Sequence, residues 1–253
     1  MRGNYMEMEK KGIKSIEVGF SIVKAVSRSD EPLTITELSK ICNMPKSQIY
    51  RYLVSLCRIG FLKKGSDLRY ALGDELISIG IRAMENVDIH IKAQPFIKQL
   101  NKTLDETIAL AIWIENEGPI FISWEESSKL IKINVRVGSI VPLTTSATGN
   151  IFAAFYPETK TKDLIDRELS KNQMNQKQLE ETLSTIKKEG YAYTQSYLPG
   201  ITAISAPIFG PNKELVAALT VIGLSGVIDI SENSIYTKEL LKTAKEISRE
   251  LGY

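Results

Sequence analysis

Five polar or basic side chains lie close together on one short segment near the amino terminus: Lys46, Ser47, Gln48, Tyr50 and Arg51. Their spacing puts them on or beside one face of a helix, separate from an apolar stripe. Amines, guanidinium groups, amides and hydroxyls supply hydrogen bonds to phosphates and to base edges. The chemistry that this pattern indicates is recognition of double-stranded DNA in its major groove.

A helix is predicted just before these residues. Thr34 and Glu37 have the spacing of a capping box, in which the hydroxyl and the carboxylate each accept a backbone N–H. Leu38, Ile41 and Cys42 recur at helical spacing, so we expect them to share the buried face of this first helix.

The helix that carries the polar face is predicted from Pro45 to Cys57. Asn43 tolerates the left-handed backbone of a sharp turn, and proline suits the first turn of a helix because its missing N–H costs nothing there. Gly60 follows as the cap region. Two short helices joined by a tight turn are therefore expected over 34–62.

A hairpin is predicted after the second helix, with strands at 61–62 and 70–72 around a turn at 65–67. Such a wing carries Lys63, Lys64 and Arg69 toward the sugar–phosphate backbone. Thr34 and Thr36, at a helix start, add hydrogen bonds to phosphate. With a further helix over 13–27, these elements predict a three-helix winged head over residues 12–73.

Composition and charge agree with this interpretation. The chain has 253 residues, of which 43% are hydrophobic and 25% are charged. Basic residues outnumber acidic ones up to residue 73 and the reverse holds afterwards, within a net charge of only +2. A positive head and a negative remainder fit a DNA-binding module joined to a sensor. No apolar run of membrane-spanning length and no secretory signal occur, so we expect no membrane association and a cytoplasmic location.

The remainder of the chain predicts a linker helix and an α+β domain. The linker helix spans about 74–86, is apolar on more than one side and would pack against a second copy of itself; the next helix, 89–104, is expected to break or begin near Pro95. Strands are predicted at 107–114, 119–124, 131–137, 191–195, 201–209 and 215–222, and helices at 147–155, 161–169, 176–189 and 231–251. The domains are then 12–73, the linker 74–88, and 89–253.

Several separated motifs make the chain resemble the IclR family of transcriptional regulators over nearly its whole length. The head matches in MPKSQIYRYL, GFLKK and RYALG, and the remainder in GSIVPLTTSATGNIFAAFYP, GYAYTQSYLPGITAISAPIF and ELVAALTVIG. The resemblance implies a two-domain α+β protein, with an N-terminal winged helix-turn-helix and a C-terminal profilin- or GAF-like antiparallel-sheet effector domain. It also implies a homodimer or dimer of dimers on operator DNA, and a small organic effector such as a carboxylate or aromatic metabolite.

The same resemblance places an effector pocket at the motif TTSATG. A turn into a helix, with backbone N–H groups and hydroxyls, is an anion site. By motif matching, the ligand-binding residues would be Ser146, Ala147, Thr148, Thr194, Gln195, Ala203, Ser205, Thr220 and Ile222. Some relatives have an acidic residue after GYA and a second serine in the last strand. This chain has Thr194, Gln195 and Ile222 there, so no particular relative's ligand transfers to it.

Two competing classes are an enzyme with an appended DNA-binding head and a DNA-binding protein without a ligand. Against the enzyme stands the lack of any nucleophile or acid–base constellation. His90 is the only histidine, and Cys42 and Cys57 fall at apolar helix positions, so no catalytic, metal or cofactor site is expected. We therefore interpret the chain as an effector-responsive transcriptional regulator and, by the habit of the family, as a repressor rather than an activator.

Overall fold

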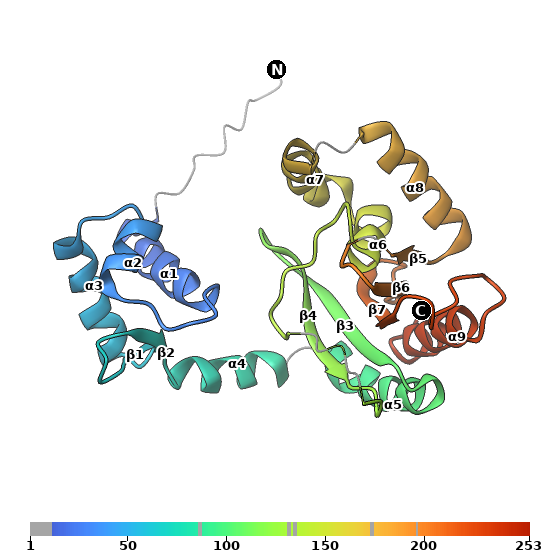
Figure 1. Ribbon diagram of the computed structural model, residues 1–253, viewed down its shortest axis with the longest axis horizontal. Helices are drawn as coiled ribbons and strands as arrows, with labels where there is room; N and C mark the ends of the chain where they lie inside the picture. The colour runs from blue at the N-terminus through green and yellow to red at the C-terminus, as the bar shows by residue number, and fades with distance from the viewer. Residues whose placement is uncertain (1–11, 86–87, 131–132, 134–135, 173–174, 196) are drawn as a thin grey trace, which may run out of the picture. The chain divides into compact units, whose positions relative to one another are not determined.

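A computed structural model describes residues 12–85, 88–130, 133, 136–172, 175–195 and 197–253 (Figure 1). Contacts divide the chain into two compact units, residues 1–86 and 87–253, which are described separately. This division places the helix before residue 86 with the first unit. The functional limits of the linker, 74–88, stay a prediction.

The first unit is the predicted winged helical head. Its elements are the helices α1 (Lys14–Ser27), α2 (Ile35–Ile41) and α3 (Lys46–Arg58), the strands β1 (Leu62–Lys64) and β2 (Tyr70–Leu72), and the helix α4 (Glu75–Glu85). β1 and β2 pair antiparallel, and Leu33 adds an isolated bridge to Tyr70. The core comes from one apolar face of each helix together with the hairpin, and it includes Ile22, Leu38, Ile49, Leu53 and Leu62.

Local chemistry sets the geometry of the helix pair. Thr34 Oγ1 accepts the backbone N–H of Glu37 at 3.3 Å, and the Glu37 carboxylate accepts the backbone N–H of Thr34 at 2.7 Å, so the capping box is confirmed. These hydrogen bonds from Thr34 lower the pKa of Glu37. Asn43 has a φ of 48°, the left-handed conformation expected for the turn.

Two details of the head differ from the prediction. Ile41 was expected on the buried face of α2, but it is 57% exposed because the helix ends at that residue. Of the expected face, Leu38 is the residue that is fully buried. Pro45 is the residue that caps α3 rather than part of it, and the helix runs from Lys46 to Arg58. The predicted bounds were therefore shifted by one residue at each end.

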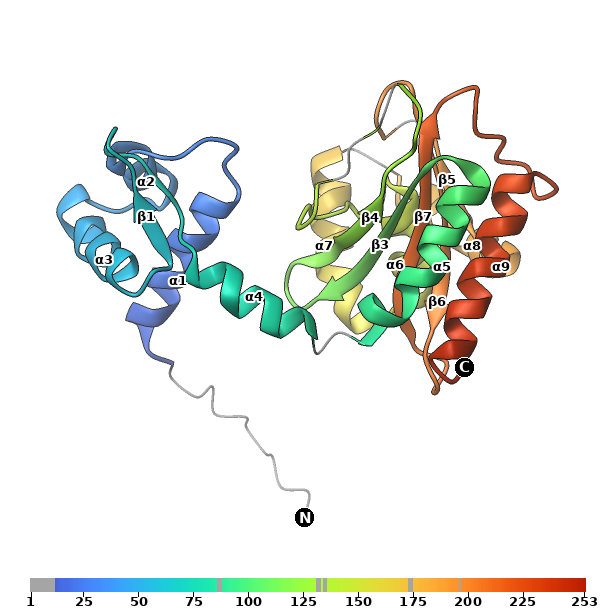
Figure 2. The same ribbon diagram turned by 90° about the horizontal axis from the view of Figure 1, so that it is seen from below.

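The second unit is an antiparallel sheet with helices on both faces (Figure 2). The strands are β3 (Thr107–Ile114), β4 (Gly118–Glu125), β5 (Ala192–Thr194), β6 (Ile201–Phe209) and β7 (Leu215–Leu224), in the spatial order β4-β3-β7-β6-β5. The helices are α5 (Asp88–Leu104), α6 (Ala147–Phe155), α7 (Glu158–Asn172), α8 (Gln176–Glu189) and α9 (Ile235–Glu250).

Strand alternation explains why this sheet has two covered faces. Ile108 and Leu110 of β3 lie in the core shared with α5 and α9, whereas Ala109 and Ala111 lie in the core shared with α6. A strand buried on both faces reads as an uninterrupted apolar run, as 107–114 does. The face under α6 carries the candidate site.

The expected break at Pro95 was wrong, because α5 continues through it. Proline removes one helical hydrogen bond, but Ala93, Ile97 and Leu100 of the same helix are buried against the sheet, and this packing offsets the loss. The predicted strand 131–137 falls partly outside the described residues. Of the described ones, Ile133 and Arg136 are in irregular structure.

Candidate functional site

The outward face of α3 is formed by polar side chains that the fold does not use. Lys46, Ser47, Gln48, Tyr50 and Arg51 are all exposed, and the Tyr50 side chain is 52% accessible. Within the described part of the chain, none of these five side chains forms a hydrogen bond or an ion pair. Buried Ile49 and Leu53, on the opposite side of α3, fix the helix against the head. The donors are thus held by a rigid helix and remain available to a partner.

The predicted wing residues are placed differently. Arg69 donates to the carbonyl of Pro32 at 2.8 Å and lies 3.5 Å from the Glu37 carboxylate. Lys63 pairs with Asp74 at 3.2 Å, and the Lys64 amine lies 5.7 Å from the centre of the Tyr70 ring. Each of these cations therefore already has a partner within the head. Of the two threonines, Thr34 belongs to the capping box, while Thr36 is exposed.

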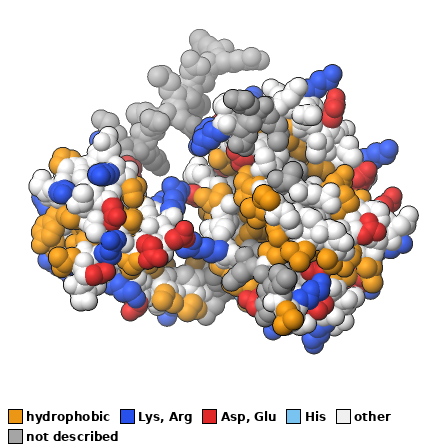
Figure 3. Space-filling model, in the orientation of Figure 1, with side chains coloured by type: hydrophobic (Ala, Val, Ile, Leu, Met, Phe, Trp, Pro, Cys, Tyr) orange, Lys and Arg blue, Asp and Glu red, His pale blue; other side chains and the backbone are white. Residues whose placement is uncertain are grey.

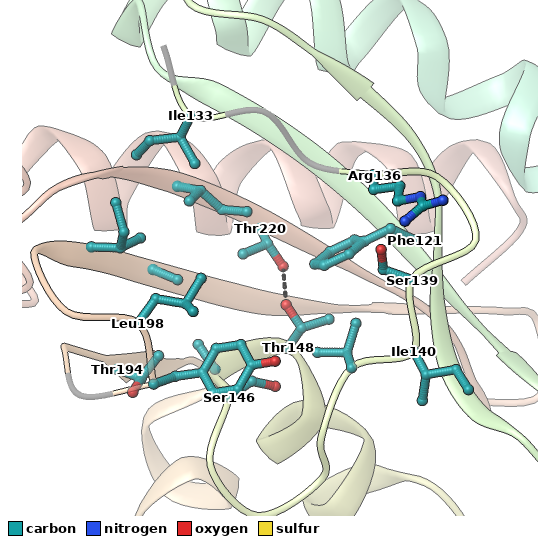
Figure 4. A pocket seen from close by; sticks show the side chains of 16 residues that line it. Phe121, Ile133, Arg136, Ser139, Ile140, Ser146, Thr148, Thr194, Leu198 and Thr220 are labelled. Atoms are coloured by element: carbon teal, nitrogen blue, oxygen red, sulfur yellow. Dashed lines mark hydrogen bonds between the residues drawn. The ribbon is translucent and has the colours of Figure 1, made fainter. Parts of the chain in front are cut away.

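A cavity of about 270 Å³ lies between the sheet and the start of α6 (Figure 4). Its lining is mostly apolar, and Arg136 is the only charged side chain among the described residues that form it. The lining comprises Phe121, Ile133, Arg136, Ser139, Ile140, Val141, Ser146, Ala147, Thr148, Thr194, Tyr197, Leu198, Ile201, Ala203, Thr220 and Ile222.

The first turn of α6 forms the polar end of this cavity. Ser146 Oγ accepts the backbone N–H of Gly149 at 2.9 Å and donates to the carbonyl of Pro142 at 2.7 Å. The amides at Ala147 and Thr148 belong to the first helical turn, where no intrahelical acceptor exists, so the turn presents partial positive charge. Gly149 permits this packing, because a Cβ there would lie 1.8 Å from the Pro142 carbonyl oxygen.

The loop that precedes α6 is held by a carboxylate of α7. Glu168 accepts the backbone N–H groups of Leu143 and Thr144, each at 2.9 Å, and the Thr144 hydroxyl at 2.8 Å. Charge-assisted hydrogen bonds of this kind are stronger than neutral ones. These bonds from Glu168 fix the TTSATG turn before any ligand binds. Burial and, to a smaller extent, the negative charge of Glu168 raise the pKa of Tyr197 in the cavity wall.

Three buried hydroxyls continue from α6 into the sheet. Thr148 Oγ1 lies 2.8 Å from Thr220 Oγ1, which lies 2.9 Å from Ser205 Oγ. Ser205 Oγ in turn donates to the carbonyl of Leu219 at 3.2 Å. The chain joins α6, β7 and β6, and its first two members line the cavity.

Most of the residues predicted for the pocket meet at this cavity. Ser146, Ala147, Thr148, Thr194, Ala203, Thr220 and Ile222 form part of its lining. Gln195 is exposed and does not line it. Ser205 is fully buried behind Thr220, so its part is indirect. β5 ends at Thr194, before Gln195, and Ser205 shares a face of β6 with Ala203 but is hydrogen-bonded to Thr220. A ligand-binding role stays a prediction for both residues.

Sequence reasoning missed the residues that come from irregular segments. Arg136, Ser139 and Tyr197 lie outside helices and strands, and Arg136 was predicted only as part of a strand over 131–137. Phe121 was predicted only as part of a strand. The available hints were the two family motifs, which contain Ser139 in GSIV (138–141) and Tyr197 in SYLPG (196–200).

Among the described residues, no helix has both the length and the apolar character needed to cross a membrane.

A winged head with an exposed, donor-rich helix, joined to a separate sheet domain with a cavity, defines a DNA-binding transcriptional regulator. Comparison with protein families agrees. The model for the bacterial transcriptional regulator IclR C-terminal domain matches residues 81–249, more than half of the chain, and the IclR helix-turn-helix domain matches residues 15–66. The chain belongs to the IclR family, whose members are transcriptional regulators and not enzymes.

Individual relatives and solved structures are similar to this chain in sequence or in fold. The HTH-type transcriptional regulator KipR of Bacillus subtilis is 27% identical, over 87% of this chain and 90% of its own. The crystal structure of HmgR from Pseudomonas aeruginosa is 31% identical, covers 95% of this chain and 99% of its own, and has a TM-score of 0.62. An IclR homologue from Microbacterium hydrocarbonoxydans, solved with 4-hydroxybenzoate, is 18% identical with a TM-score of 0.75, covering 94% and 98%.

Proposed function

We propose that this regulator binds operator DNA through the outward face of α3 and that a small organic acid in the sheet-domain cavity controls its operator affinity. The observation that carries the first part is the set of exposed, uncommitted donors from Lys46 to Arg51. Lys63, Lys64 and Arg69 contact the DNA backbone from the wing, at the expense of contacts within the head. Thr34 and Thr36 add phosphate contacts.

The cavity supports an acid as effector. The α6 amino terminus and Arg136 both favour negative charge, and the remaining wall favours an apolar or aromatic body. The relative solved with 4-hydroxybenzoate is consistent with a ligand of this kind. The backbone amides of Ala147 and Thr148, in the helical turn that Ser146 caps, hold the acid group. Thr194, Ala203, Thr220 and Ile222 contact the body of the ligand.

The working unit is a homodimer or a dimer of dimers. α4 leaves Ile77, Ile79 and Ile81 exposed, and Ile77 is 61% accessible. On the first unit of the chain, hydrophobic side chains reach the surface between charged ones (Figure 3). Exposed apolar side chains on more than one side of a helix are typical of an interface between subunits. Residues 74–88 then act as the linker between the head, 12–73, and the effector domain, 89–253.

Effector binding favours one arrangement of the paired heads over another and so changes operator affinity. The regulator acts as a repressor in the cytoplasm. A regulator of this kind needs an effector that binds its two arrangements with different affinities, since equal binding shifts nothing.

The test replaces Ser146 with phenylalanine, which fills the polar end of the cavity. Effector response, measured as the change in operator affinity on adding the acid, should be lost while operator affinity without effector stays within about threefold. Ser170→Phe, on an exposed face of α7 outside the cavity, is the matched control and should keep the response. A Ser146→Phe protein that still responds would place the effector site elsewhere.

A further inference from the structure

Three buried hydroxyls form a hydrogen-bonded chain beside the cavity, and the direction in which each one donates its proton is called the proton order here. This order restricts which ligand groups can form a hydrogen bond with the chain. A hydroxyl has one proton, and the three hydroxyls of Thr148, Thr220 and Ser205 make three hydrogen bonds. The last bond ends on the Leu219 carbonyl, which can only accept. Ser205 must therefore give its proton to Leu219, Thr220 must give its proton to Ser205, and Thr148 must give its proton to Thr220.

No proton of this chain is left for the cavity. Thr148 and Thr220 line the cavity and retain only lone pairs toward a ligand (Figure 4). All three side chains are buried, and Thr220 and Ser205 are fully inaccessible, so water does not compete for their protons. A ligand acceptor here could take a proton only from Thr148, and the hydrogen bond between Thr148 and Thr220 would then be lost.

We infer that the cavity selects acids that carry a hydroxyl donor, and that it discriminates against analogues with a carbonyl or ether oxygen at the same position. This rests on the proposed function, since it refines the acid that the cavity binds. A hydroxyl donates to Thr148 without disturbing the chain, whereas a carbonyl meets the Thr148 lone pairs. Ser205 acts as a positioning residue, because it sets the proton order without touching the ligand.

The test compares acids in matched pairs that differ in this one group: mandelate with phenylglyoxylate, lactate with pyruvate, and 4-hydroxybenzoate with 4-methoxybenzoate. Affinities for the full-length protein are measured by calorimetry, after a thermal-shift screen. Within the pair that contains the tightest binder, the hydroxyl member should bind about three- to tenfold more tightly, the net effect of one hydrogen bond. Equal binding within that pair, or tighter binding of the carbonyl or ether member, overturns the inference.

Two variants test the proton order itself. In Ser205→Ala the Thr220 proton is free to turn to Thr148, whose own proton then faces the cavity, so the preference for the hydroxyl member should vanish or invert. Thr220→Val, which keeps the side-chain shape, should act in the same direction and serves if Ser205→Ala does not fold. Thr202→Ala removes a buried hydroxyl of β6 that bonds to Ser225 outside the cavity. This variant should leave the ratio of the two affinities within a pair unchanged.

The outcomes separate the two proposals. Acids that bind with no difference within pairs, or a ratio unchanged in both Ser205→Ala and Thr220→Val, leave the effector site intact but overturn the hydroxyl selection. Acids of all three pairs that fail to bind, at concentrations where the protein stays folded, count against an acid as effector. The hydroxyl selection then falls with it.

Discussion

The outward face of α3 and the cavity of the sheet domain hold their polar groups in opposite ways. On α3, the side chains of Lys46, Gln48 and Arg51 are exposed and form no hydrogen bond within the described part of the chain. In the cavity, Ser146, Thr148 and Thr220 are buried and already hydrogen-bonded to one another or to backbone. The first arrangement suits a large, charged, hydrated partner. The second suits a small ligand that must match a fixed pattern of donors and acceptors.

The sharpest test of this contrast is ionic strength. Lys and Arg contacts to phosphates release counterions, so operator affinity should fall by about 10³-fold between 50 and 200 mM salt if six or more phosphates are neutralised. Acid binding in the cavity should change far less, because few charges are involved. Fluorescence anisotropy with an operator duplex enriched from random DNA measures the first quantity, and calorimetry the second. A flat operator curve would contradict the assignment of the head.

The packing of α6 against its own loop predicts the next largest effect. Gly149→Ala should lower the free energy of unfolding of the sheet domain by about 3 kcal/mol, because the new Cβ meets the Pro142 backbone. Gly80→Ala is the control: nothing lies within 4 Å of a Cβ there, and α4 should gain about 0.5–1 kcal/mol. Denaturant unfolding gives both values. Equal stability of the two variants would show that α6 has room to shift.

Two arginines of the head, Arg51 and Arg69, allow exposed side chains to be compared with side chains that bond within the fold. Arg51→Ala should weaken operator binding by about 1–3 kcal/mol for a bidentate base contact, with little change in stability. Arg69→Ala should instead lower the melting temperature of the head, because its bonds to Pro32 and Glu37 are lost. Fluorescence anisotropy measures the operator affinity of both variants, and thermal unfolding measures their melting temperatures. Unchanged operator affinity in Arg51→Ala would remove Arg51 from the interface.

The smallest effect concerns the capping box. Thr34→Ala should destabilise the head by about 1 kcal/mol, since it removes the cap of α2. Thr34→Ser keeps the hydroxyl and should restore most of the loss. Chemical unfolding of the three proteins at neutral pH measures the difference.

The capping box of Thr34 and Glu37 also makes the stability of the head depend on pH, and the lowered pKa of Glu37 fixes the direction of that dependence. Hydrogen bonds from Thr34 lower the pKa of Glu37, so the folded head binds this proton more weakly than the unfolded chain. The stabilisation is present above the ordinary pKa of glutamate and is lost as the pH falls through the lowered pKa. The difference in free energy of unfolding between Thr34→Ala and the unaltered chain should therefore become smaller in acid. A gap that widens there would mean that another group is responsible.

Elements defined by short-range rules were predictable from the sequence. Thr34 with Glu37, the left-handed Asn43 and the limits of α6 and α8 follow from capping, turn chemistry and periodicity, which depend on neighbouring residues. The sheet strands followed from apolar runs, and β3 and β6 have their predicted bounds. Pro95 was misjudged because burial of the rest of α5 outweighs the lost hydrogen bond.

The sequence by itself determined a donor-rich helix on a small winged head, because the side chains of one helix face need only their own spacing to come together. Only the tertiary structure decided that the α3 donors stay exposed while Arg69 of the wing is used by the fold. It also decided the wall of the cavity, which brings Arg136 and Tyr197 from irregular segments beside Thr148 and Thr220. Residues separated by many positions meet only when the sheet aligns them, and no local pattern encodes that distance.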